Sequence, residues 1–187
     1  MVNNHRREAD QNPPLFFMCF GLFLVFCLLK PGVFQAQKIK NHYVSSIQQK
    51  GTLYFIRPQK GFKNKRAGSS FVYDMTCFSS SDSVTLNFSY FDKNSRTLDS
   101  LYLMAGSIKT GFPIVKIFIE TKKSRWHYRF TSRVSLNELE AFFKATEMGT
   151  MALMEKQKPI PLTSTKRRWK KYAAINTRIF QLIRHNK

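Results

Sequence analysis

An apolar run near the N-terminus determines which part of the chain is available to form a folded domain. Residues Leu15–Leu29 (LFFMCFGLFLVFCLL) are all apolar or glycine, and the basic pair Arg6 and Arg7 precedes them. As a helix the run is about 22 Å long, which is shorter than a hydrocarbon core of about 30 Å but sufficient for the apolar part of a secretory signal. We therefore predict that residues 1–36 are a signal peptide and that the protein is exported, either to a periplasm or to the medium.

The cleavage site leaves a second interpretation open. Signal cleavage requires small residues at positions −1 and −3, and the best site, after Ala36, has Phe34 at −3. Without cleavage, residues 15–29 would anchor the chain in a membrane. With cleavage, the association of this segment with the membrane is transient.

The chain is strongly basic and poor in cysteine. It has 31 Lys and Arg against 11 Asp and Glu, a formal net charge of +20. Of its three cysteines, only Cys77 lies beyond the predicted signal, so the domain has no internal disulfide and must be stabilised by packing. The charge favours an anionic surface or an acidic macromolecule as partner, but it does not distinguish anionic lipid, acidic glycan and nucleic acid.

Hydrophobic alternation predicts an antiparallel sheet after a polar leader. We assign residues 37–50 to the leader and 51–187 to one domain. Two hairpins and two shorter strands are predicted where apolar and polar residues alternate or β-formers cluster: Phe71–Phe78 with Val84–Phe91, Ile114–Glu120 with Arg125–Val134, and Thr52–Arg57 and Ser100–Met104. Thr150–Met154 is a candidate for a further strand. The stretches 59–70 and 106–113 are predicted to be loops, and Pro159 and Pro161 to mark an extended link.

Two helices are predicted near the C-terminus. Ser135 and Glu138 match the capping-box spacing ahead of an amphipathic run that ends near Glu147. A second helix is expected to begin after Thr163–Thr165 and to end near Arg184. The predicted fold class is therefore α+β: an antiparallel β-sheet or small sandwich of about six strands, with two C-terminal helices packed on one face.

Two groups of cations are the candidate binding residues. The first group lies at the start of the last helix, where cations oppose the helix dipole: Lys166, Arg167, Arg168, Lys170 and Lys171. The second group, Arg125 and Arg129, lies on the polar face of a strand whose aromatic residues point to the other face. Each group either binds a polyanion, such as lipid phosphate, or simply faces water.

No catalytic, cofactor-binding or metal site is predicted. Cys77 falls in the apolar register of its strand, the acidic residues are scattered, and phosphate-loop and nucleophile-elbow motifs are missing from the sequence. The leading hypothesis is a non-enzymatic binding or structural protein of the cell envelope. The alternatives are a polyanion-binding protein that uses the basic C-terminal helix, and an enzyme with a small polar pocket that matches no common motif.

Overall fold

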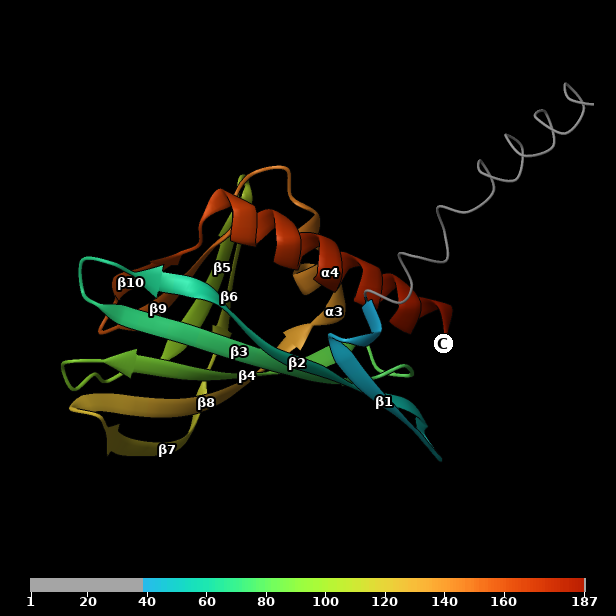
Figure 1. Cartoon of the computed structure of the whole chain (residues 1–187), viewed down its shortest axis with the longest axis horizontal. Helices are drawn as coiled ribbons and strands as arrows, with labels where there is room; N and C mark the ends of the chain where they lie inside the picture. The colour runs from blue at the N-terminus through green and yellow to red at the C-terminus, as the bar shows by residue number, and fades with distance from the viewer. Residues whose placement is uncertain (1–38, 187) are drawn as a thin grey trace, which may run out of the picture. The chain divides into compact units, whose positions relative to one another are not determined.

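A computed structural model describes residues 39–186, whose main elements are ten strands and the helices α3 and α4 (Figure 1). The predicted signal peptide, including the run 15–29, lies outside these residues. The strands are β1 (Tyr43–Gln48), β2 (Gly51–Asn64), β3 (Ser69–Phe78), β4 (Ser83–Asp92), β5 (Ser100–Ala105), β6 (Ile108–Pro113), β7 (Val115–Lys122), β8 (Arg125–Ser135), β9 (Thr150–Glu155) and β10 (Lys158–Thr163). The helices are α3 (Leu136–Lys144) and α4 (Lys166–His185).

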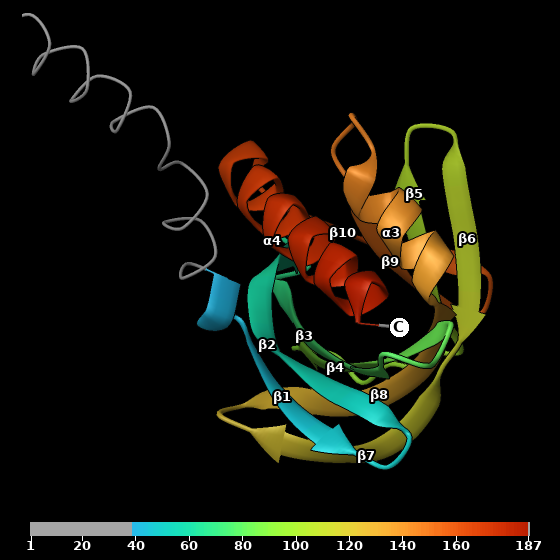
Figure 2. The same ribbon diagram turned by 90° about the vertical axis from the view of Figure 1, so that its right-hand side faces the viewer.

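All the strands belong to one antiparallel sheet. Its order is β6-β5-β9-β10-β2-β3-β4-β8-β7, and β1 pairs with the first half of β2. The two edge strands β6 and β7 are consecutive in the chain, with only Ile114 between them. The sheet therefore curls strongly, and the hydroxyl of Ser132 on β8 donates to the carbonyl of Pro113 at the end of β6, at 2.8 Å. Figure 2 shows that α3 and α4 occupy the concave side of this curl.

Aromatic residues form most of the core between the sheet and the helices. Phe88 on β4 stacks between Phe71 on β3 and Phe130 on β8, with ring centroids 4.8 and 5.3 Å apart. Phe143 on α3 contacts Trp169 on α4 with centroids 5.8 Å apart, and it also stacks on Tyr73 of β3 at 6.5 Å. Since each such aromatic pair contributes about 0.5–1.5 kcal/mol beyond its buried area, these contacts couple both helices to the central strands.

A buried polar network attaches α4 to the sheet. The Asn176 side chain is fully buried in the middle of α4, and its Oδ1 accepts a 2.6 Å hydrogen bond from Gln59 Nε2. The Tyr73 hydroxyl donates to Gln59 Oε1 at 2.7 Å, and Asn176 Nδ2 donates to the same oxygen at 3.1 Å. Burial raises the pKa of Tyr73 far above its ordinary value, so its hydroxyl stays a donor. The network defines the position of α4 along β2 and β3.

The predicted fold class is confirmed at the level of α+β, but the sheet has more strands than predicted. The expected six strands, or small sandwich, are instead ten strands in one curled sheet. Strand β1 lies in the predicted leader. The end of β2 and the whole of β6 lie in predicted loops, and β10 replaces the predicted extended link.

The strands that differ from the prediction are either mostly exposed or contain proline or glycine, residues that are depleted in strands. Five of the six residues of β1 are exposed. In β10, Pro159 and Pro161 pair with β9, and no residue of β2 is in register opposite them. Their missing N–H groups therefore cost little, because proline is tolerated where a strand has no second neighbour.

Both predicted hairpins and both helices are confirmed, with one wrong detail. The hairpins are β3–β4 and β7–β8. Thr165 caps α4, since its Oγ1 accepts from the backbone N–H of Arg168 at 3.4 Å. The predicted capping box at Ser135 is wrong, because the Ser135 side chain makes no cap hydrogen bond. The backbone N–H of Leu136 instead donates to the carbonyl of Asp82 at 2.8 Å.

Candidate anion-binding surface

The first two turns of α4 present a cationic face to solvent. The helix carries seven Lys and Arg and no acidic residue. The five cations singled out from the sequence are all exposed, and within residues 39–186 none of them forms an ion pair. They are Lys166, Arg167, Arg168, Lys170 and Lys171. We call this set the α4 cationic face; its charges are available to an external anion.

Trp169 holds this part of α4 against the rest of the fold. Trp169 lies between Arg168 and Lys170 in the sequence, but its side chain is buried, with 5 % of its surface exposed. Its ring meets Phe142 edge-on at 5.1 Å and Phe62 at 6.3 Å between centroids. Gly149 allows the ring to lie this close, since a Cβ at that position would stand 2.4 Å from Trp169 Cη2. The cationic face therefore rests on a rigid base.

Strand β2 adds positive charge beside α4. An added Cβ at Gly61 would lie 3.4 Å from the Tyr172 ring, so the strand backbone passes close to the helix at this point. Burial, Lys171 and Arg57 together lower the pKa of His42. The charge of Lys171 on α4 and that of Arg57 on β2 therefore both act on His42, just before β1.

Arg125 and Arg129 do not belong to the same surface. Arg129 Nη2 donates to Asp74 Oδ2 at 2.6 Å in an ion pair, and Nη1 donates to Ser89 Oγ at 3.3 Å. Arg125 Nη2 donates to the backbone carbonyls of Gly68 and Phe91, at 2.6 and 3.0 Å. Both arginines connect neighbouring strands.

The alternation of β8 places the two groups on opposite faces of the sheet. Tyr128 and Phe130, the neighbours of Arg129 along the strand, are buried in the core against which α4 packs. Arg125 and Arg129 share the other register of the strand. The cations of α4 and those of β8 therefore cannot contact one flat ligand together.

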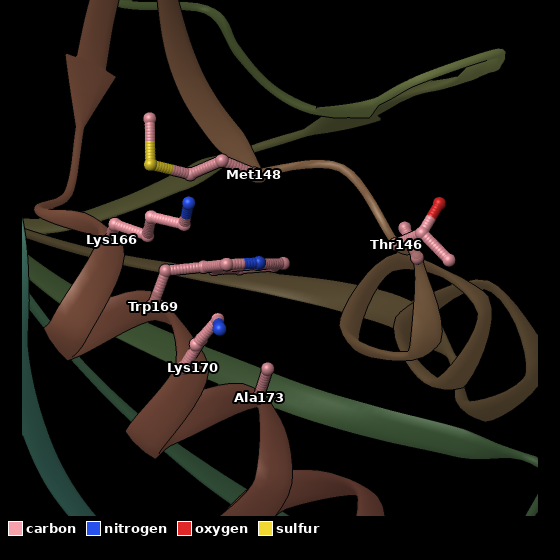
Figure 3. Close-up of a pocket in the computed structure, with 7 residues that line it drawn as sticks. Thr146, Met148, Lys166, Trp169, Lys170 and Ala173 are labelled. Atoms are coloured by element: carbon pink, nitrogen blue, oxygen red, sulfur yellow. The ribbon is translucent and has the colours of Figure 1, made fainter.

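A groove opens beside the α4 cationic face. It has a volume of about 470 Å³. Lys166, Trp169, Lys170 and Ala173 line it on the helix, and Ala145, Thr146 and Met148 line it on the segment after α3. Figure 3 shows the Trp169 ring extending from α4 toward the segment that carries Thr146, with Met148 and Lys166 beside each other.

No sequence pattern indicates this groove. Its two walls are separated by the whole of β9 and β10, and residues 145–149 have no periodic pattern. The sequence shows that Lys166 and Lys170 lie on one face of a helix. It does not show that Ala145 and Met148 lie beside them, because these residues come from a distant segment.

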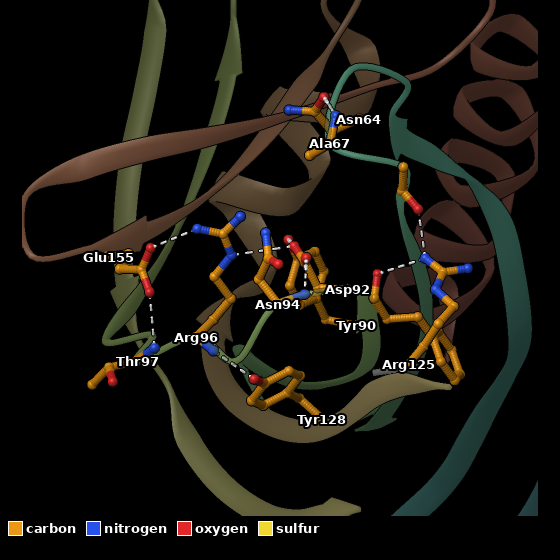
Figure 4. A network of polar contacts seen from close by, with 12 residues as sticks. Asn64, Ala67, Tyr90, Asp92, Asn94, Arg96, Thr97, Arg125, Tyr128 and Glu155 are labelled. Carbon is orange, nitrogen blue, oxygen red and sulfur yellow. Dashed lines mark hydrogen bonds and ion pairs between the residues drawn. The ribbon is translucent and has the colours of Figure 1, made fainter. Parts of the chain in front are cut away.

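A buried carboxylate forms the most connected polar cluster in the described part of the chain (Figure 4). Asp92 is fully buried and accepts hydrogen bonds from the Tyr90 hydroxyl, the Asn94 backbone at 2.9 Å and Arg96 Nε at 3.3 Å. Arg96 also pairs with Glu155 on β9 at 3.0 Å. These bonds connect the link after β4 to the far side of the sheet. The groove and the smaller cavity beside Cys77 are lined by other residues.

The remaining candidates for chemistry do not form a reactive site. Cys77 is buried in the core, as predicted, and burial raises the pKa of its thiol to about 12. It is therefore a poor nucleophile. Within residues 39–186 no group of three His, Cys, Asp or Glu side chains is placed to hold a metal ion. Of the helices in the same range, none is both long and apolar enough to cross a membrane.

Comparison with protein-family models, with curated proteins and with solved structures finds no match for this chain.

Proposed function

We infer that this chain is a non-enzymatic binding protein, exported to the cell envelope, whose α4 cationic face binds the anionic surface of a membrane. One observation carries this proposal. Five exposed cations, none with an ion-pair partner in the described part of the chain, lie on one rigid stretch of helix. Three of them, Lys166, Arg167 and Arg168, lie in the first turn and oppose the helix dipole, so each of these costs about 0.3–1 kcal/mol of local stability. A function that uses their charge would offset that cost.

Lipid is favoured over nucleic acid by the aromatic residues of the surface. Single-stranded nucleic acid is usually bound by aromatic rings exposed next to positive charge. The only tryptophan of α4, Trp169, is buried between other rings. Tyr172 is half-buried, and Lys171 Nζ lies over its ring, 5.8 Å from the centroid. An apolar groove lies next to the cations instead, which suits an amphiphilic surface better than a base.

The test compares two variants of equal charge. In the first, Lys166, Arg167, Arg168, Lys170 and Lys171 are all replaced by glutamine. The control replaces five exposed lysines elsewhere by glutamine: Lys116, Lys122, Lys123, Lys156 and Lys158. Binding of the full chain to vesicles with and without phosphatidylglycerol is measured by co-sedimentation at low and high salt.

The α4 variant is expected to lose about a hundredfold in affinity for anionic vesicles. Each basic residue near an anionic membrane contributes about 1 kcal/mol, and about three of the five cations can face a flat surface at once. The control variant should bind much like the unmodified chain, and salt should weaken both. Equal losses in the two variants would show that net charge, not α4, drives binding. Tighter binding to heparin or single-stranded DNA than to vesicles would reject the membrane as the target.

A further inference from the structure

The groove beside α4 has the chemistry of a site for a single-chain anionic amphiphile. We propose that it holds the acyl chain of an anionic lipid, while Lys166 and Lys170 bind the headgroup. The groove proposal rests on the proposed function and extends it. The charged surface alone would bind any anionic membrane, whereas the groove would select one kind of lipid molecule.

The interior of the groove is apolar and partly rigid. Trp169 is held by Phe142 and Phe143, so the helix side of the groove has a fixed shape. On the opposite side Met148 is exposed over 45 % of its surface. An unbranched thioether adapts to irregular apolar ligands. An alkyl chain could therefore lie against Trp169 and be covered by Met148.

The rim of the groove is positively charged. Lys166 and Lys170 are one helical turn apart, so both ammonium groups can reach the same anion. By contrast Lys144, at the end of α3, is neutralised by Glu140 at 2.8 Å. Glu147 lies in the segment that forms the groove wall, but a Cβ built on Gly106 would stand 3.0 Å from its carboxylate, so it packs against the β5–β6 turn.

The size of the groove suits one chain. A volume of about 470 Å³ is within the range of about 300–1,000 Å³ typical of small-molecule sites. Contact with a flat anionic membrane would need only the cations. The groove also offers apolar side chains next to Lys166 and Lys170, so a ligand with an anionic head and an apolar tail is favoured over a purely ionic ligand.

The test uses alkyl phosphates of increasing length below their micelle concentrations. Trp169 serves as the reporter, in a full chain carrying Trp126→Phe so that its fluorescence is the only tryptophan signal. Affinity should rise about fourfold per methylene and then level off when the groove is full. Inorganic phosphate and neutral dodecyl maltoside should each bind at least tenfold more weakly than dodecyl phosphate.

Variants separate the groove from the charged face. Ala173→Phe fills the groove without changing charge, and should weaken dodecyl phosphate binding at least tenfold. Ala174→Phe adds the same bulk at an exposed neighbouring position and should bind like the parent. Met148→Glu places a carboxylate at the mouth of the groove in an exposed side chain, so it provides a second test if Ala173→Phe fails to fold.

The outcomes distinguish the two proposals. Unchanged dodecyl phosphate binding in Ala173→Phe and Met148→Glu, or affinity that rises with chain length without a plateau, would overturn the groove proposal. If anionic vesicles still bind through the α4 cationic face in that case, the proposed function stands. Loss of the methylene dependence in the Ala173→Phe variant, with vesicle binding retained, would support the groove.

Discussion

Replacing Gly149 by alanine is expected to destabilise the fold by about 2–3 kcal/mol. The new Cβ would stand 2.4 Å from Trp169 Cη2 and 2.6 Å from Phe142 Cζ. Carbon atoms in contact are normally about 3.5–4.0 Å apart, so one ring must move by about 1 Å. Neither ring can swing away, because Trp169 also packs against Phe143 and Phe62, and Phe142 packs against Phe143.

The assay is urea unfolding, with a thermal scan beside it. For a chain of this size the loss corresponds to a fall in Tm of about 5–10 °C. Because Trp169 is a wall of the groove, its emission should also shift in the folded variant. The same variant should therefore weaken alkyl phosphate binding and lower stability together.

Gly61→Ala is the matched control on the other side of α4. Its added Cβ would meet Ser164 Oγ and the Tyr172 ring at 3.4 Å, which needs a movement of only a few tenths of an ångström. We expect a change within about 1 kcal/mol, because the lower entropy of the unfolded alanine chain partly offsets any crowding. Equal stability of Gly149→Ala and the parent chain, or equal losses in both variants, would refute this account of how Trp169 is seated.

Two further predictions concern how α4 is attached. Asn176→Leu should lower the free energy of unfolding in urea by about 1–3 kcal/mol, because the amide of Gln59 is left buried without its partner. Adding Gln59→Leu should recover part of this loss. If the losses of the two single variants simply add in the double variant, the network does not couple these residues. The buried carboxyl of Glu140 is destabilised by desolvation, but hydrogen bonds and ion pairs from Lys144 and Arg184 outweigh this and lower its pKa. Its stabilising effect should therefore be complete above about pH 5 and decline as the pH falls through the ordinary glutamate pKa of about 4.3 toward the lower folded value. Glu140→Gln should flatten this part of the stability profile, and an unchanged acid limb would exclude the mechanism.

Local patterns in the sequence are sufficient to identify the elements with one buried face. The hairpin β3–β4 is predictable because apolar residues alternate along both strands. Helix α4 is predictable from its apolar stripe and the Thr165 cap, and its five cations are clustered within six consecutive positions of the sequence. In each case the signal lies within about 20 residues, since side-chain periodicity is a local property of the backbone.

Contacts between distant segments cannot be predicted in this way. Arg129 is a binding candidate from its place on a strand, but its pairing with Asp74 spans 55 residues. Asn176 resembles an ordinary polar position in an amphipathic helix, but its partner Gln59 is 117 residues away. Such pairings cannot be identified from a single sequence, because they depend on how distant strands align and on where α4 packs against the sheet.

By itself, the sequence determined an apolar N-terminal run, a basic chain with a single cysteine after residue 36, two β-hairpins and two amphipathic helices, one of them strongly cationic. Only the tertiary structure decided that ten strands curl into one sheet, that the arginines of β8 bond to neighbouring strands on the convex face, and that α4 lies beside residues 145–149 to form a groove. The physical reason is that periodicity specifies which face of an element is buried. What that face is buried against depends on the long-range packing of the whole chain.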